Sequence, residues 1–292
     1  MAGFINSIRD ILRKKDTLFT LIFVNVAIFA VCAIFRVIGV LFEINYPDLG
    51  IYFEVSSNVH TALSHFWTLF TYMFLHYDIW HILFNMLMLY WFGLIFRSYF
   101  TSKHLVAVYI LGGIAGALFY ILTFNTIPYF VGLGASSMIG ASGAVTAIIF
   151  AAAFYNRNLE VGLLFLGRIK IIYIALFIFL LDFIALGGGS NTGGHVAHIG
   201  GAVFGYLFAT QYLKGRDITK WFNYLIDRVA NLFKRSPKMK VSYRKGKTDE
   251  LYNQQRHSNE VEIDRILDKI KQSGYNSLND EEKKRLFDAS NK

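Results

Sequence analysis

The sequence has little charge, a single cysteine and only three prolines in 292 residues. Charged residues make up 17% of it, against about 25% in soluble domains, and 54% is hydrophobic. This composition excludes a disordered chain and an ordinary soluble enzyme. Because the one cysteine, Cys32, lies inside an apolar run, it offers neither an internal disulfide nor a cysteine-rich metal site.

The charges that are present lie near the two ends of the chain. Residues 17–213 carry equal numbers of basic and acidic side chains, so the formal net charge of +9 comes from residues 1–16 and 214–292. A long, nearly uncharged stretch between basic flanks predicts a polytopic membrane domain rather than a nucleic-acid-binding protein.

Six stretches are apolar enough to cross a hydrocarbon core, which takes about 20 residues. They lie near 17–40, 79–97, 104–124, 139–156, 169–187 and 195–213. Residues 63–77 are too short to span, so we expect them at the interface, with Trp67, Tyr72 and Tyr77 among the headgroups. No internal repeat is visible, which gives an inverted-repeat transporter no support.

The loops predict an orientation. Loops 98–103 and 157–168 and both ends are basic, whereas loops 41–66, 125–138 and 188–194 contain no Lys or Arg. Since basic loops stay in the cytoplasm, we expect both termini there, with Arg36 snorkelling as the one exception. The predicted domains are a basic N-terminal segment at 1–16, the membrane domain at 17–213, a basic juxtamembrane linker at 214–247 and a small helical tail at 248–292.

The linker and the tail allow only general predictions. The basic linker either binds anionic lipid or simply anchors the topology. Within the tail, residues 260–289 suggest two short amphipathic helices separated at Gly274, with Ser277 in the N-cap region of the second.

A few polar side chains fall inside the predicted spans, where they are costly and mark functional sites. At about 1.5 Å per helical residue, Ser142, His198 and His81 all lie roughly 22–24 Å from the cytoplasmic ends of their spans. A neutral histidine at this level can remove the proton of a serine hydroxyl. The neighbouring glycines permit a helix start at the serine and close helix contact: Gly140, Gly143, Gly201 and Gly205.

Each of these groups also has a purely structural interpretation. Ser142 can be a helix-packing serine bonded to a backbone carbonyl, and His198 a buried histidine with its hydrogen bonds satisfied. His81 and Asn85, one turn apart, either donate to a developing oxyanion or form an interhelical network.

Two further polar residues leave alternatives open. Asp182 either orients His198 as a third triad member, or is protonated or bonded to nearby backbone. His195 and His198 with His81 provide three imidazoles, but no HExxH pattern accompanies them, so we expect no metal and no cofactor.

Three motifs in order on the second, fourth and sixth predicted spans resemble the rhomboid family of intramembrane serine proteases. They are His76 with His81 and Asn85, then Gly140-Ala141-Ser142-Gly143, then Ala197-His198 with Gly201 and Gly205. The resemblance covers about residues 15–213. One departure is that Thr68 follows Trp67, where the family often has Trp-Arg.

The resemblance implies a fold, a mechanism and a partner. The fold would be an all-α, six-span bundle with the short fourth helix at its centre, plus a small soluble helical tail. The activity would be cleavage of transmembrane segments of other membrane proteins through a Ser142–His198 dyad, with His81, Asn85 and the Ser142 N–H as the oxyanion hole. Residues 41–78 would be a half-embedded loop and the fifth span a lateral gate.

The resemblance also implies a location in the cell, and two alternative functions stay open beside it. The form of the chain is typical of the bacterial inner membrane, with the active site opening to the extracytoplasmic side and the bilayer as its surroundings. If a dyad suffices, Asp182→Asn should keep substantial activity. An inactive rhomboid-like protein that binds membrane clients, and a transporter, are the alternatives.

Overall fold

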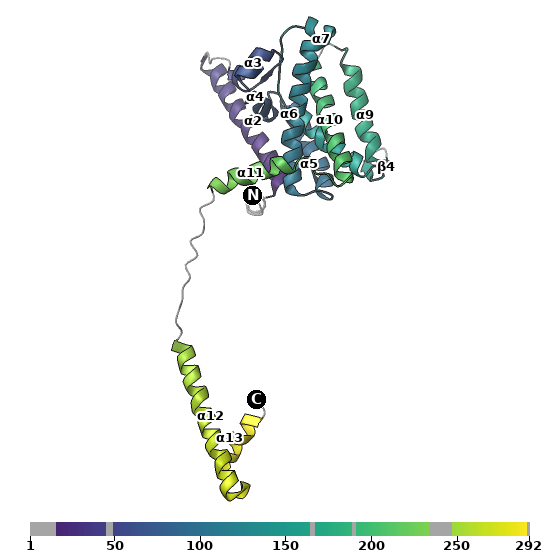
Figure 1. Cartoon of the computed structure of the whole chain (residues 1–292). Coiled ribbons are helices and arrows are strands. Elements are labelled where there is room, and N and C mark those ends of the chain that lie inside the picture. The colour runs from purple at the N-terminus through teal and green to yellow at the C-terminus, as the bar shows by residue number, and fades with distance from the viewer. Residues whose placement is uncertain (1–15, 45–48, 164–166, 189–190, 234–246, 291–292) are drawn as a thin grey trace. The chain divides into compact units, whose positions relative to one another are not determined.

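The computed structural model of the chain describes residues 16–44, 49–163, 167–188, 191–233 and 247–290. The chain divides into two compact units, Met1–Phe233 and Lys234–Lys292 (Figure 1). The predicted N-terminal segment 1–16 lies outside the described residues apart from Asp16, and so does the stretch 234–246 of the predicted linker.

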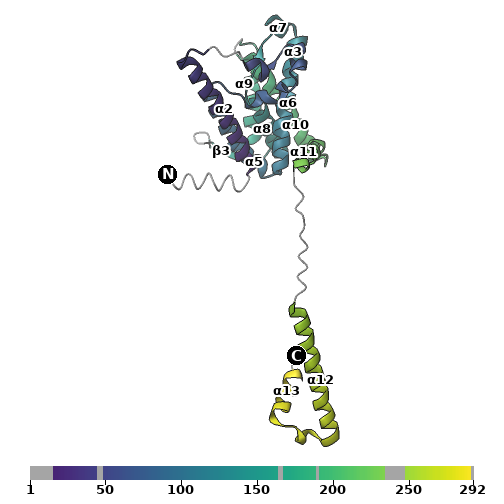
Figure 2. The ribbon, with the colours of Figure 1, turned by 90° about the vertical axis from the view of Figure 1, so that its left-hand side faces the viewer.

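Among the described residues of the first unit, six helices form a bundle with one of them at its centre. They are α2 (Thr17–Leu41), α5 (Ile79–Arg97), α6 (Ser102–Thr126), α8 (Ser142–Tyr155), α9 (Ile171–Ala185) and α10 (Thr192–Leu213). Helix α8 contacts α5, α6, α9 and α10, and Figure 2 shows it in the middle of the unit. Every residue from Gly143 to Ala153 is buried, because small side chains let neighbouring helices cover α8 on all sides.

Three of the described helices, α2, α5 and α6, are long and apolar enough to cross a membrane. Helices α8 and α9 are shorter, with 14 and 15 residues. Helix α10 has 22 residues, but its first half is rich in glycine and contains two histidines. By length and composition, three helices can cross a membrane, and the count of six spans stays a prediction.

Polar residues at the helix ends fix where the long helices begin. Asp78 accepts hydrogen bonds at 2.9 Å from two backbone N–H groups in the first turn of α5, and Thr101 forms a capping box with His104 on α6. Asp16 caps α2 and receives two hydrogen bonds from Arg97 Nη1, at 2.6 and 2.8 Å. This ion pair ties the first turn of α2 to the last turn of α5.

The structure is mostly helical, as predicted, and the first unit also contains two short antiparallel strand pairs. Strand β1 (Val55–Ser56) pairs antiparallel with β2 (Ser137–Met138), and β3 (Glu160–Leu163) with β4 (Gly167–Lys170). The other short elements are η1 (Leu49–Tyr52), α3 (Val59–Ser64), α4 (Thr68–Thr71), η2 (Tyr72–Phe74) and α7 (Pro128–Gly132).

The prediction that Tyr72 lies among the lipid headgroups is wrong. Its side chain is 1% exposed, and its hydroxyl donates a 2.6 Å hydrogen bond to the Gly113 carbonyl oxygen. Trp67 and Tyr77 are 40% and 48% exposed. Of the three residues predicted among the headgroups, one thus lies in the core and two lie at the surface.

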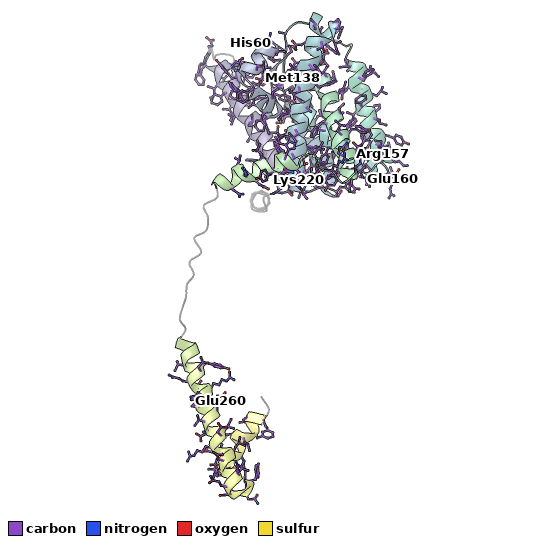
Figure 3. The ribbon with its side chains drawn as sticks, in the orientation of Figure 1. His60, Met138, Arg157, Glu160, Lys220 and Glu260 are labelled. Atoms are coloured by element: carbon purple, nitrogen blue, oxygen red, sulfur yellow. The ribbon has the colours of Figure 1, made fainter. Side chains whose placement is uncertain are left out.

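The basic loops gather at one end of the first unit. Figure 3 shows Arg157, Glu160 and Lys220 at that end, and His60 and Met138 near the opposite one. The ion pair of Asp16 with Arg97 belongs to the same end as Arg157, because α2 starts and α5 stops there (Figure 1).

The structure has a helix inside the predicted linker that the sequence analysis missed. Helix α11 (Lys220–Phe233) belongs to the first unit and contacts α6. The predicted linker is therefore partly a folded element of the membrane unit.

The second unit is a helical hairpin. Helix α12 (Lys247–Ser273) is longer than predicted and ends at Gly274, whose φ of +76° suits glycine. After η3 (Tyr275–Ser277), α13 (Asp280–Ser290) begins with a cap from Asn279 and not from Ser277. Asn279 Oδ1 accepts from the backbone N–H of Glu282, whose carboxylate accepts from the Asn279 N–H.

Candidate active site

Helix α8 begins at Ser142 because the preceding backbone turns sharply at a glycine. Gly140 has a φ of +117°, and its N–H donates to the Tyr72 carbonyl oxygen at 2.9 Å. A Cβ atom at this position would lie 2.7 Å from His81 Cε1. Only glycine combines this backbone conformation with the close approach of the His81 ring.

Helices α8 and α10 meet at glycines. A Cβ atom on Gly201 would lie 2.9 Å from the carbonyl carbon of Gly143 and closer still to its oxygen. One turn further, a Cβ atom on Gly205 would also overlap the α8 backbone. Since His198 lies one turn before Gly201, this contact brings it to the end of α8 that starts with Ser142.

Ser142 and His198 line one cavity of about 780 Å³. Its walls come from α5, α8, α9 and α10, and the polar residues on them are His81, Asn85, Ser142, Thr146, Asp182, Asn191, His195 and His198. Both Ser142 and His198 are half-buried. Among the described residues none forms a hydrogen bond with Ser142 Oγ, so the two residues share the cavity without a direct bond.

Asp182 on α9 joins two histidines of α10. Its Oδ1 lies 2.8 Å from Nδ1 of His195 and 2.8 Å from Nδ1 of His198, and the residue is 6% exposed. A neutral imidazole that donates from Nδ1 keeps its Nε2 as a proton acceptor. The contact to Asp182 therefore suits His198 to a role as a base on its other side.

Within the part of the chain that the structure describes, the same three residues form a group that could hold a metal ion. Their ligand atoms all lie within 4.8 Å of one another. The sequence analysis considered His81 with the two histidines of α10, but the structure groups them with Asp182 instead. Carboxylate and imidazole ligands suit a divalent transition metal, although the hydrogen bonds account for the same contacts.

Asn85 and His76 hold the turn before Ser142. Asn85 Nδ2 donates to the His81 carbonyl oxygen at 3.0 Å and lies 3.3 Å from His76 Nε2. The backbone N–H of Ala141 donates to that same His76 nitrogen at 3.3 Å. His76, named from the sequence without an assigned role, is thus a fully buried support of the turn.

The groups that can donate to an oxyanion differ in whether their hydrogens already have hydrogen-bond partners. Ser142 occupies the first position of α8, where the backbone N–H has no acceptor within the helix. The His81 ring faces the cavity beside Gly140. Asn85 also lines the cavity, but both of its amide hydrogens already have neighbours in His81 and His76.

The fold and the cavity define a mostly helical membrane protein with a largely apolar chamber among its helices, into which serine, histidine and aspartate side chains project. Residues 63–215 match the rhomboid domain family, and the chain belongs to that family, which confirms the resemblance. Residues 247–292 match a family of unknown function, DUF6576.

One curated relative is the RHOMBOID-like protein 12, mitochondrial, of Arabidopsis thaliana. It is 27% identical over 214 residues, which are 70% of this chain. The match spans 61% of the relative's length.

Proposed function

We propose that the chain is an intramembrane serine endopeptidase that cleaves transmembrane segments of other membrane proteins. The observation that carries the proposal is that Ser142, at the start of α8, and His198, on α10, line one cavity inside a rhomboid-family fold. No cofactor takes part in the proposed reaction.

Ser142 Oγ attacks the scissile carbonyl carbon and His198 Nε2 takes its proton. The negative charge moves to the carbonyl oxygen, which accepts hydrogen bonds from the Ser142 N–H and the His81 ring. Asn85 joins them by exchanging its 3.3 Å contact with His76 for the substrate oxygen. His198 then protonates the leaving amine, and water hydrolyses the acyl-enzyme with His198 again as the base.

Asp182 serves as a positioning residue in this scheme. By accepting from His198 Nδ1 at 2.8 Å, it holds the tautomer whose Nε2 faces the cavity. The same Asp182 oxygen also contacts His195 Nδ1, so it is not available to His198 alone.

Substrate access from the bilayer is supported by the apolar walls of the cavity. Trp80 and Phe84 on α5 and Leu181 on α9 all line it, and each is more than half exposed at the outer surface of the unit. A helix in the membrane can therefore approach between α5 and α9. It must unwind locally before its peptide bond becomes accessible.

We further propose that the protein lies in a bacterial inner membrane with both termini in the cytoplasm. The basic end of the first unit, with Arg97 and Arg157, would face the cytoplasm. The start of α8 lies toward the other end, so the cavity would receive water from the extracytoplasmic side.

Cleavage of a tagged single-span protein in proteoliposomes tests the proposal. Ser142→Ala and His198→Ala should each lower kcat by at least about 10³-fold, because the two residues act as one unit. Ser64→Ala and His60→Ala are matched controls, since both side chains are exposed on α3 and should leave the rate unchanged.

A fluorophosphonate probe separates the proposed protease from its competitors. It should label the parent chain and the control variants, but not Ser142→Ala. A Ser142→Ala protein that cleaves like the parent overturns the mechanism. A parent chain that neither reacts with the probe nor cleaves, but binds membrane proteins, is a client-binding protein.

A further inference from the structure

Helix α11 carries an apolar stripe that the described residues leave uncovered. Trp221, Leu225 and Val229 follow one another at intervals of four, which places them on one face of the helix. Their exposed fractions are 60%, 50% and 45%, and Ile226 beside them is 46% exposed. So many large apolar side chains on one helix face mark an interaction site.

The polar side of α11 is fixed to the membrane unit. Lys103 Nζ, at the start of α6, lies 2.6 and 2.8 Å from the two carboxylate oxygens of Asp227. Thr219, just before the helix, is fully buried, and Phe222 packs against the core. These contacts set the rotation of α11 about its axis, so that the apolar stripe stays turned away from the bundle.

The position of α11 relative to the bundle follows from the same contacts. Lys103 lies at the basic end of the first unit, and Figure 1 shows α11 lying across α6 at that end. Because α6 is long and apolar enough to cross a membrane, the end of α6 lies at the level of the lipid headgroups. A helix lying across that end is at the same level.

The charges around α11 favour an anionic partner. Lys220 and Arg228 lie on the helix, with Lys214 and Arg216 shortly before it. The sequence that follows, residues 234–247, contains seven Lys or Arg and no Asp or Glu. A strongly amphipathic helix with basic flanks and an aromatic apolar face is the pattern of an interfacial membrane helix.

We propose that α11 is an anionic-lipid-binding helix that lies in the surface of the bilayer holding the bundle. The stripe of Trp221, Leu225 and Val229 enters the boundary between headgroups and acyl chains. Lys220 and Arg228 bind phosphate groups of acidic phospholipids. The interaction does not depend on proteolysis, because it uses none of the cavity residues.

Trp221 itself reports on this interaction. In the full-length chain the other three tryptophans, Trp67, Trp80 and Trp91, are changed to phenylalanine. The protein is reconstituted into vesicles of phosphatidylcholine or of an equimolar mixture with phosphatidylglycerol. We expect brominated phospholipids to quench Trp221 fluorescence, more strongly in the mixture, and aqueous iodide to quench it weakly.

Two variants test the apolar stripe and the charges separately. Leu225→Asp with Val229→Asp should abolish quenching by brominated lipid and restore quenching by iodide. Lys220→Gln with Arg228→Gln should abolish only the increase caused by phosphatidylglycerol. Leu251→Asp is the matched control, because Leu251 on α12 is 60% exposed, and it should change neither signal.

Each other outcome overturns part or all of the proposal. Strong iodide quenching in both vesicles means that the stripe faces water. Protection from iodide without quenching by brominated lipid means that protein covers the stripe. Equal quenching by brominated lipid in the two kinds of vesicle overturns the proposed preference for anionic phospholipid.

A nitroxide probe gives a second measurement if loss of three tryptophans prevents folding. It is attached at Val229→Cys in a Cys32→Ser chain that keeps its tryptophans. Accessibility to oxygen greater than to a water-soluble nickel complex supports insertion, and the reverse order overturns it.

Discussion

Substitution of Gly201 by alanine tests whether the contact between α8 and α10 sets the geometry of the cavity. The new Cβ atom would lie 2.9 Å from the carbonyl carbon of Gly143, whereas nonbonded carbons rest at about 3.5–4.0 Å. The two helices must therefore separate by at least about 0.6–1.1 Å at this point, and by more if the Gly143 oxygen is to be relieved. Both atoms belong to helix backbone, so no side-chain rotation can absorb the overlap.

Two effects should follow from this separation. Overpacking of this kind costs about 1–3 kcal/mol, and about 2–4 °C of Tm accompanies each kcal/mol in a unit of this size. A displacement near 1 Å between catalytic groups costs about 10²-fold in rate, so Gly201→Ala should lose most of its cleavage activity. Thermal unfolding measures the first effect, and cleavage of the tagged substrate the second.

Two other glycines provide matched controls. Gly132→Ala on α7 meets no atom within 4 Å and should change neither Tm nor rate. For Gly93→Ala on α5, the nearest atoms to the new Cβ belong to the end of the flexible Leu18 side chain, at 2.5 Å, so this variant should lower Tm slightly and spare activity. If Gly201→Ala melts and cleaves like Gly132→Ala, the contact does not organise the site.

Two further predictions concern carboxylates. Asp182→Asn should lower kcat about tenfold with KM unchanged, because a charge-assisted hydrogen bond of roughly 1.5 kcal/mol to His198 is lost. A decrease in kcat of about 10⁴-fold would show that Asp182 acts as a full triad member. An unchanged kcat would show that the carboxylate is purely structural. Asp217 loses solvation on burial, which alone would raise its pKa, but hydrogen bonds from Thr219 and the nearby His104 outweigh this and hold its pKa below the ordinary 3.8. Its ionised form therefore stabilises the fold at neutral pH, and this contribution disappears as the pH falls through the lowered pKa. Asp217→Asn should lower Tm at pH 7, and the difference from the parent should shrink as the pH falls below 3.8 and vanish below the lowered pKa; a difference that persists at that pH would contradict the assignment.

The sequence alone determined where the long helices α2 and α5 lie, and it predicted which residues carry the chemistry. Stretches 17–40 and 79–97 match α2 and α5 to within one residue, because each apolar run begins directly after a capping acid, Asp16 or Asp78. It placed the start of α8 at 139, three residues early, because hydropathy does not register the positive φ of Gly140. It missed α11 because that helix is amphipathic, and a search for uninterrupted apolar runs does not register a single apolar face.

The order of the motifs predicted Ser142 and His198 as the catalytic pair, but not what surrounds them. Only the tertiary structure decided that Asp182 bridges two histidines, that His76 supports the turn before Ser142, and that Tyr72 belongs to the core. Hydropathy and spacing describe one segment at a time. The distance between α8 and α10 depends on the absence of side chains on both helices at once, which becomes visible only when Gly143 and Gly201 face each other.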